Sequence, residues 1–270
     1  MNDLNKDIKI FFIDLDGTLL DKRGKHTHGI SEENINALTA AKKNGKIIVI
    51  STGRTGLQAK KYLDKIDHTY AVTGNGSIIL NNGKIEKEIF MSLRQSLLIL
   101  DFVKKHGLVL KIDDSRIGYG SFKFLQTLVT KKMNFEPVKN FNYELHKQYH
   151  KIVIWGKSRK KMEEIRVIIK SEIKGLSVVS SSKGWTLEIS HESATKGFGN
   201  LYVASKFGII NKKEMAHIGD SMNDSTVIGH MRLIAMKNSV KELYSMTNYI
   251  GPSYKYGGVA KILKGEYKIK

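Results

Sequence analysis

The stretch Ile8-Lys9-Ile10-Phe11-Phe12-Ile13-Asp14-Leu15-Asp16-Gly17-Thr18 decides how this chain folds. Its first six residues are mostly apolar and predict a strand, and a glycine turn follows them. Residues i and i+2 of a strand share a face, so Asp14 and Asp16 can converge on one reacting group where the strand ends. This geometry suits a nucleophile beside a proton donor, although a polar turn that ends a strand would give the same residues.

Composition narrows the class of protein. With 270 residues, of which 41% are hydrophobic, the chain can bury a large core in one large domain or two modest ones. No apolar run reaches the roughly 18 residues that a membrane span needs, and no signal-peptide core precedes the first strand. We therefore expect a cytoplasmic protein with no membrane partner. The chain has no cysteine, so disulfides are excluded and a metal would need oxygen or imidazole ligands, which suits magnesium better than zinc.

The net charge of +19 arises from 45 Lys and Arg against 26 Asp and Glu. Such a charge can steer anions toward a protein or coat nucleic acid, and the charge alone does not distinguish these uses. Many lysines occur as pairs, such as Lys42-Lys43 and Lys160-Lys161, on segments that read as amphipathic helices. This pattern favours solvated helix faces, so we do not expect nucleic acid to be a partner.

Strands and helices alternate at both ends of the chain. After the first strand, Ser31 can cap a helix that ends at Gly45, and Thr55 can cap a second one. The remaining elements of this pattern are strands at 46–50, 69–73, 215–218 and 233–236 and helices at 195–207 and 258–263. This alternation predicts an α/β fold, namely a Rossmann-like three-layer core with a mostly parallel sheet.

Residues 80–186 show a different pattern of predicted helices and strands, which indicates an inserted α+β module. One helix begins with the capping-box pattern Ser92-Leu93-Arg94-Gln95, another runs from Ser158 to Lys174, and short strands alternate with them. The core would then consist of residues 1–79 and 187–270. The entry at 81–83 and the exit at 180–184 are short, which is compatible with hinge motion.

Three further groups follow predicted core elements. Ser51-Thr52-Gly53-Arg54 offers a hydroxyl and backbone amides for phosphate, although a simple strand-to-helix turn would look the same. Lys196 could offset the charge of a nucleophilic aspartate and a phosphoryl group, although most single lysines are merely solvated. Gly219-Asp220-Ser221-Met222-Asn223-Asp224 supplies oxygen ligands suited to magnesium, or a polar loop in which Asp224 caps a helix. Together with the aspartate pair, all lie where open parallel sheets form their ligand crevices, which favours a common site.

These residues resemble motifs I to IV of the haloacid dehalogenase-like hydrolase superfamily, in order and in spacing. The turn Gly74-Asn75-Gly76 and the segment Ala235-Met236-Lys237-Asn238 are similar to patterns of its Cof-type sugar-phosphatase branch. In that branch the insert is a C2-type cap that closes over the site. The loop 21–29 carries several basic residues and is longer than this branch usually has, and the resemblance implies no role for it.

The resemblance implies a phosphoric monoester hydrolase that works through an aspartyl-phosphate. Asp14 would attack phosphorus, and Asp16 would protonate the leaving alcohol and later deprotonate the attacking water. The phosphoryl group would be bound by Thr52, Gly53, Lys196 and Asn223.

The resemblance also implies Mg²⁺ as the cofactor. Its ligands would be the Asp14 carboxylate, the Asp16 backbone carbonyl and Asp220, with Asn223 and Asp224 as close supporting groups at the metal. Possible substrate contacts are Arg54, Asn75 and Asn238.

The expected substrate is a small phosphorylated metabolite such as a sugar phosphate, and the expected protein is a monomer or weak dimer. A phosphosugar mutase shares the motifs and remains an alternative. A basic nucleic-acid-binding protein with vestigial motifs is a more distant one, motivated only by the charge.

Overall fold

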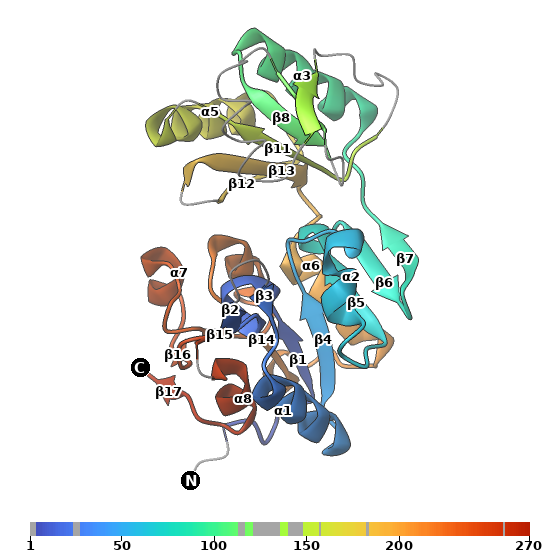
Figure 1. Ribbon diagram of the computed structural model, residues 1–270, viewed down its shortest axis with the longest axis vertical. Helices are drawn as coiled ribbons and strands as arrows, with labels where there is room; N and C mark the ends of the chain where they lie inside the picture. The colour runs from blue at the N-terminus through green and yellow to red at the C-terminus, as the bar shows by residue number, and fades with distance from the viewer. Residues whose placement is uncertain are drawn as a thin grey trace. The chain divides into compact units, whose positions relative to one another are not determined.

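The computed structural model describes residues 4–23, 28–112, 117–120, 136–139, 148–156, 158–181, 184–255 and 257–270. The chain divides into two compact units, each with its own sheet (Figure 1). The first unit, which we call the core unit, consists of Met1–Lys87 and Thr195–Lys270. The second unit consists of Glu88–Ala194 and is inserted into the core unit.

The core unit is built on a nine-stranded sheet. In spatial order its strands are β17 (Lys268–Ile269), β16 (Tyr249–Ile250), β15 (Arg232–Ala235), β14 (Met215–Gly219), β1 (Ile10–Ile13), β4 (Ile47–Ser51), β5 (Tyr70–Thr73), β6 (Ile78–Asn81) and β7 (Lys84–Glu88). All pairings from β16 to β5 are parallel, whereas β17 and β6 pair antiparallel with their neighbours. The predicted mostly parallel sheet is confirmed.

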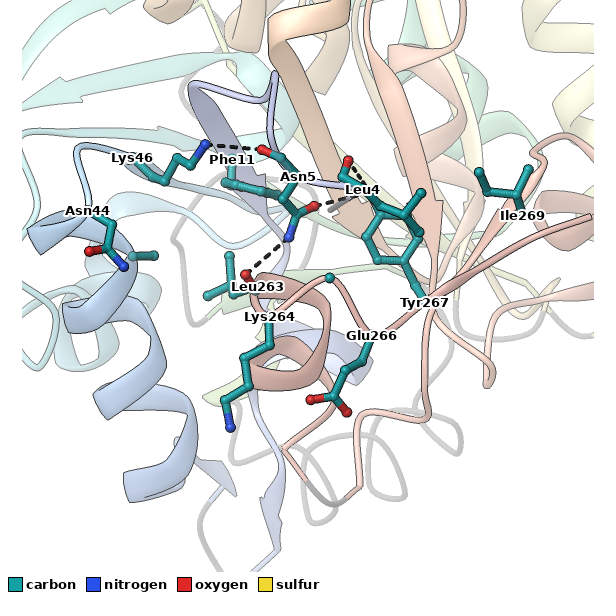
Figure 2. A pocket seen from close by; sticks show the side chains of 12 residues that line it. Leu4, Asn5, Phe11, Asn44, Lys46, Leu263, Lys264, Glu266, Tyr267 and Ile269 are labelled. Atoms are coloured by element: carbon teal, nitrogen blue, oxygen red, sulfur yellow. Dashed lines mark hydrogen bonds between the residues drawn. The ribbon is translucent and has the colours of Figure 1, made fainter. Parts of the chain in front are cut away.

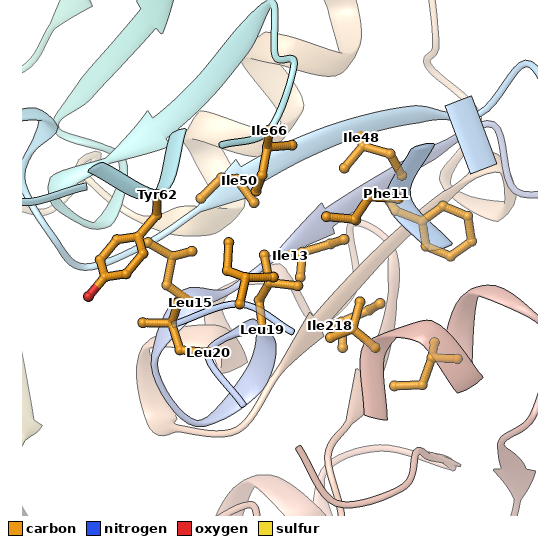
Figure 3. Packing of buried hydrophobic residues seen from close by; sticks show 14 of the residues in the cluster. Phe11, Ile13, Leu15, Leu19, Leu20, Ile48, Ile50, Tyr62, Ile66 and Ile218 are labelled. Atoms are coloured by element: carbon orange, nitrogen blue, oxygen red, sulfur yellow. The ribbon is translucent and has the colours of Figure 1, made fainter. Parts of the chain in front are cut away.

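Helices cover both faces of this sheet and make the predicted three layers. On one face, α1 (Glu32–Lys43), α2 (Gly56–Leu63) and α8 (Gly258–Leu263) contribute to a cluster that includes Phe11 and Ile13 of β1 (Figure 3). On the other, α6 (Lys196–Lys206) and α7 (Lys241–Ser245) pack with Ile10 and Phe12. Because alternate β1 residues face opposite layers, the apolar run before Asp14 is buried on both sides.

Helix caps fix where the chain leaves the sheet. The side chains of Ser31, Thr55 and Thr195 accept hydrogen bonds from the third residue after each of them, at the starts of α1, α2 and α6. Such caps satisfy amide groups that the first helical turn leaves without partners. The cap at Thr55 therefore starts α2 at Gly56, shortly after Thr52. The cap at Thr195 starts α6 at Lys196 itself.

In the second unit, helices pack against a mostly antiparallel sheet. The spatial order of its strands is β10 (Glu136–Lys139), β9 (Ile117–Tyr119), β8 (Val109–Ile112), β11 (Lys151–Trp155), β13 (Thr186–His191) and β12 (Leu176–Ser181). Helices α3 (Leu93–Lys105) and α5 (Arg159–Glu172) share one apolar cluster with this sheet. Ser92 and Gln95 form the predicted capping box at the start of α3.

The units divide later in the chain than the sequence suggested. The insert spans Glu88–Ala194 rather than 80–186, because β6 and β7 extend the core sheet and β13 belongs to the second sheet. Asn82 and Gly83, expected at an entry hinge, instead form the two-residue turn between β6 and β7, and both have positive φ values of 48° and 75°. Ser180 and Ser181, expected at the exit, are instead the last residues of β12 within the second unit, and residues 182–183 lie outside the described ranges.

Shorter elements complete the described chain. Strands β2 (Lys22–Arg23) and β3 (His28–Gly29) form an antiparallel ribbon in the loop after Asp21, whose residues 24–27 lie outside the described ranges. Short helical segments are η1 (Leu15–Leu19), η2 (Gly74–Gly76), η4 (Lys212–Glu214) and η5 (Met222–Val227). Among the described helices, not one has the length and apolar character of a membrane span.

A cavity of about 800 Å³ lies in the core unit near the amino ends of β1 and β4 (Figure 2). Its polar lining is largely engaged with the main chain. Lys46 donates to the carbonyls of Asn5 and Ile8, and the Asn5 amide donates to the carbonyls of Ile262 and Leu263. The cavity contains no residue of the predicted site.

Candidate active site

The predicted motifs meet at the carboxyl end of the central strands of the core unit. Asp14 follows β1, Thr52 follows β4 and Asp220 follows β14, and these strands are neighbours in the parallel sheet. Lys196 is the first residue of α6. Residues nearly two hundred positions apart are thereby brought together, as the parallel topology requires.

A buried lysine joins two of the aspartates. Lys196 Nζ lies 2.7 Å from Asp14 Oδ1 and 2.6 Å from Asp224 Oδ1, and all three side chains are almost completely buried. An unpaired charge is costly in such surroundings, so these groups depend on one another for their ionised forms.

The pKa values of these three ionisable groups are shifted in different directions. Burial raises the pKa of Asp14, helped by the neighbouring Asp224 and Asp220 carboxylates, and Lys196 only partly opposes the rise. Burial also works against the ionised form of Asp224, but Lys196 and His217 outweigh it and lower its pKa. Although burial acts against the charged form of Lys196, the two carboxylates raise its pKa. The ammonium therefore stays charged at neutral pH.

Asp220 is packed directly against the first motif. An added Cβ at Gly17, whose φ is +75°, would lie 2.2 Å from Asp220 Oδ2. The Asn238 amide donates to the Gly17 carbonyl at 2.9 Å and to Asp220 Oδ2 at 3.4 Å, while its oxygen accepts from the Tyr254 amide. Asn238, expected as a substrate contact, thus links the first and fourth motifs.

Asp16 is paired with Arg54 through both oxygens. Arg54 Nε donates to Oδ2 at 2.7 Å and Nη2 donates to Oδ1 at 2.6 Å, which is the fork geometry of a strong charge-assisted pair. The Asp16 side chain is about half exposed, at 54%, whereas that of Asp14 is 6% exposed. The hydrogen bonds from Arg54 to Asp16 raise the pKa of the guanidinium. Arg54, expected as a substrate contact, here holds the expected proton donor.

Thr52, Gly53, Asn75 and Asn223 form a second contact group. Asn223 Nδ2 donates to Asn75 Oδ1 at 2.9 Å, and a Cβ at Gly53 would lie 2.8 Å from that same oxygen. Asn75 has a φ of 59°, which few residues other than glycine and asparagine adopt readily. Thr52 is buried, and its hydroxyl accepts from the Arg54 amide at 3.1 Å. Glycine at position 53 therefore permits the close approach of Asn75, to which Asn223 of the fourth motif is hydrogen-bonded.

The aspartates form a donor set that fits a hard metal ion. Asp14, Asp220 and Asp224 each offer a carboxylate oxygen, and these atoms lie within 4.8 Å of one another. Burial and the Asp224 carboxylate raise the pKa of Asp220 to about 7, so a cation would relieve crowded negative charge. Carboxylate oxygens with no sulfur ligand suit magnesium, calcium or manganese rather than softer metals.

Asp224 differs from the other two because both its oxygens already accept two protein donors. Lys196 and His217 bind Oδ1, and the amides of Asp220 and Ser221 bind Oδ2 at 2.9 Å each. This arrangement favours a supporting role over direct ligation of a metal. It also fixes the loop that carries Asp220.

Sequence reasoning assigned no role to three residues of this region. His217 and Asn200 are buried and hydrogen-bonded behind Asp224, and Ser221 Oγ lies 2.6 Å from Asn223 Oδ1. A histidine inside the otherwise apolar strand 215–218 was a usable signal, because buried polar side chains need partners. Nothing in the spacing pointed to Asn200.

Comparison with known proteins agrees with this geometry. A family model described as haloacid dehalogenase-like hydrolase matches residues 11–263. A putative phosphatase of Haemophilus influenzae is 25% identical over 268 residues, which cover 96% of this chain and 98% of that protein. A 5-amino-6-(5-phospho-D-ribitylamino)uracil phosphatase of Bacillus subtilis is 26% identical, covering 96% of this chain and all of that one.

Solved structures share the whole architecture. A phosphatase of the HAD superfamily from Bacteroides thetaiotaomicron superposes with a TM-score of 0.81 at 18% identity, over 96% of this chain and 95% of that one. At this identity the likeness concerns the fold, including the presence of an inserted second domain. Since the family model spans both units and the motifs lie together, the chain belongs to the haloacid dehalogenase-like hydrolases, in their Cof-type branch, and is an enzyme.

Proposed function

We propose that this enzyme is a Mg²⁺-dependent phosphatase that hydrolyses small phosphorylated metabolites through an aspartyl-phosphate on Asp14. As a member of this branch, whose curated relatives are named phosphatases, it is a phosphoric monoester hydrolase. The observation that carries the mechanism is the buried Asp14 carboxylate, held through Oδ1 by Lys196. Within the described residues no other group hydrogen-bonds this side chain, which leaves Oδ2 to act as the nucleophile.

In the first step Asp14 Oδ2 forms a bond to phosphorus while the bond from phosphorus to the alcohol oxygen breaks. Asp16 gives a proton to that oxygen, so the alcohol leaves neutral. Arg54 donates one hydrogen bond to each Asp16 oxygen, which leaves a second lone-pair site on each oxygen for the transferred proton. Lys196 stays on Asp14 Oδ1 and neutralises charge beside the phosphoryl group.

In the second step a water attacks the phosphorus of the aspartyl-phosphate. Asp16 takes the proton of this water, and the bond between phosphorus and Asp14 breaks to release inorganic phosphate. The Thr52 hydroxyl, which accepts from the Arg54 amide, would donate its own proton to a phosphoryl oxygen at the carboxyl end of β4. Mg²⁺ would be held by Asp14, the Asp16 carbonyl and Asp220, and it would supply charge neutralisation to the phosphoryl oxygens.

The acceleration that phosphate-ester hydrolysis demands explains why so many charges converge. It reaches about 10²¹-fold for the slowest monoesters, or roughly 28 kcal/mol of barrier reduction. A single hydrogen bond contributes far less than that, so positioning and electrostatic neutralisation must act together.

A panel of phosphorylated metabolites tests the proposal. It should include sugar phosphates and 5-amino-6-(5-phospho-D-ribitylamino)uracil, the substrate in the name of a relative. Phosphate release that needs Mg²⁺ and disappears in Asp14→Asn is the expected result. Equal activity of Asp14→Asn would exclude the mechanism, and a phosphoryl group returned to the sugar rather than to water would indicate a mutase.

A further inference from the structure

His217 is a buried titratable residue that the proposed mechanism does not use. It lies in β14 with no exposed surface, two residues before Gly219. Both nitrogens of its ring have a partner: Nε2 lies 2.8 Å from Asp224 Oδ1, and Nδ1 lies 3.1 Å from Asn200 Nδ2.

The partners define which ring nitrogen carries the proton. An ionised carboxylate can only accept, so the proton that faces Asp224 resides on Nε2, and Nδ1 then accepts from the Asn200 amide NH₂ group. The Asn200 nitrogen also lies 3.7 Å from Met231 Sδ, a weak acceptor, which agrees with this orientation of the amide. His217 therefore donates Nε2–H to Asp224 as a neutral ring. Burial lowers the pKa of His217, which also favours the neutral form of the ring.

The carboxylate that receives this hydrogen bond determines the position of two other site residues. Asp224 Oδ1 is shared between His217 and Lys196, and Lys196 is in turn shared with Asp14. The second oxygen holds the amides of Asp220 and Ser221. A Cβ at Gly219 would lie 2.2 Å from Asp224 Cγ, so the carboxylate is also packed closely against the strand end.

We propose that His217 is a positioning residue, whose Nε2–H fixes the rotation of the Asp224 carboxylate and thereby holds Lys196 on Asp14 and the Asp220 loop in place. Without this donor, Asp224 Oδ1 keeps only Lys196, and the carboxylate can turn toward the ammonium. Lys196 would then move off Asp14, and the amides of Asp220 and Ser221 would follow Oδ2. The proposal rests on the proposed function, because it concerns the same site.

Two substitutions by uncharged residues distinguish the role of Nε2 from that of Nδ1. In His217→Gln the side-chain amide reaches the place of Nε2 and can donate to Asp224, whereas in His217→Asn it reaches only the place of Nδ1. Residues that orient a site from behind typically contribute 10- to 100-fold to activity or metal affinity. We expect His217→Asn to lower kcat at least about tenfold with KM changed less than about threefold, and His217→Gln to keep kcat within about threefold.

Binding of Mn²⁺ to the substrate-free protein, followed by electron paramagnetic resonance, gives a readout independent of turnover. The affinity should fall in His217→Asn and be retained in His217→Gln, and thermal unfolding shows that both variants are folded. Equal losses in the two variants, or unchanged constants in His217→Asn, would overturn the proposal. If the wild type releases no phosphate from any compound while Mn²⁺ affinity still separates the variants, the proposed function fails and the positioning role stands.

Discussion

Replacing Gly17 with alanine should inactivate the site while leaving most of the fold stability intact. Gly17 has a φ of +75°, and an alanine there costs about 1–2 kcal/mol because the left-handed backbone brings Cβ against the following carbonyl. The new Cβ would also lie 2.2 Å from Asp220 Oδ2, where ordinary contacts begin at 3.4 Å. Either the Asp220 carboxylate or the loop that carries Asp14 and Asp16 must therefore move by about 1.2 Å.

The size of the effect follows from this displacement. A misplacement of about 1 Å in a catalytic constellation can cost about 100-fold in rate, which corresponds to roughly 2.7 kcal/mol of transition-state stabilisation. We expect kcat/KM for phosphate release to fall about 100-fold in Gly17→Ala, with weakened Mn²⁺ binding. Urea unfolding should show a loss of only about 1–2 kcal/mol in stability.

Gly45→Ala is the matched control. Gly45 has a φ of +77° at the end of α1, and nothing lies within 4 Å of an added Cβ. Its backbone cost equals that of Gly17→Ala, but it should leave kcat/KM unchanged. Our reading of the contact between the first and fourth motifs would be refuted by wild-type kcat/KM in Gly17→Ala, or by an equal loss of activity in Gly45→Ala.

Three further predictions concern charge and capping. Lys196→Met leaves the Asp14 and Asp224 carboxylates buried without a counter-charge, so urea unfolding should show a loss of about 3–5 kcal/mol, and this loss should shrink at lower pH as the carboxylates take up protons. Metal-free protein should lose stability as pH rises from about 4 toward 7, because folded Asp220, with its pKa raised to about 7, keeps a proton that the unfolded chain releases. The rise in Tm caused by Mg²⁺ should accordingly be larger at pH 8 than at pH 6, and an equal rise at both would count against this assignment. Ser92→Ala removes the capping box of α3 and should lower stability by about 1 kcal/mol in urea unfolding without changing kcat, and any loss of kcat would contradict a purely local role.

The core of the fold could be predicted because its signals are local. Apolar runs, the caps at Ser31 and Thr55, and Gly45 after the first helix indicate the strand and helix alternation, which in turn implies a parallel sheet. The boundary of the insert was placed too early because Asn82-Gly83 was read as a linker. Its two residues with positive φ are instead typical of a hairpin turn that adds β7 to the core sheet.

The candidate site was likewise predictable only in part. Asp14, Lys196 and Asp220 could be selected because the ends of parallel strands converge whatever the side chains are. Which side chains pair with each other depends on packing across the motifs, so the fork between Asp16 and Arg54 and the role of His217 became visible only in the structure. The cytoplasmic location and the monomeric or weakly dimeric state stay predictions.

The insertion of the second unit sets the order in which this enzyme can become complete during synthesis. The central strand β1 pairs with β14, about two hundred residues later in the chain, so one flank of β1 stays unpaired until most of the protein has left the ribosome. The inserted unit is continuous in sequence and can fold in the meantime. Asp14 and Thr52 emerge early, whereas Lys196, Asp220 and Asp224 arrive late, so a truncated or stalled chain carries the nucleophile without the groups that activate it.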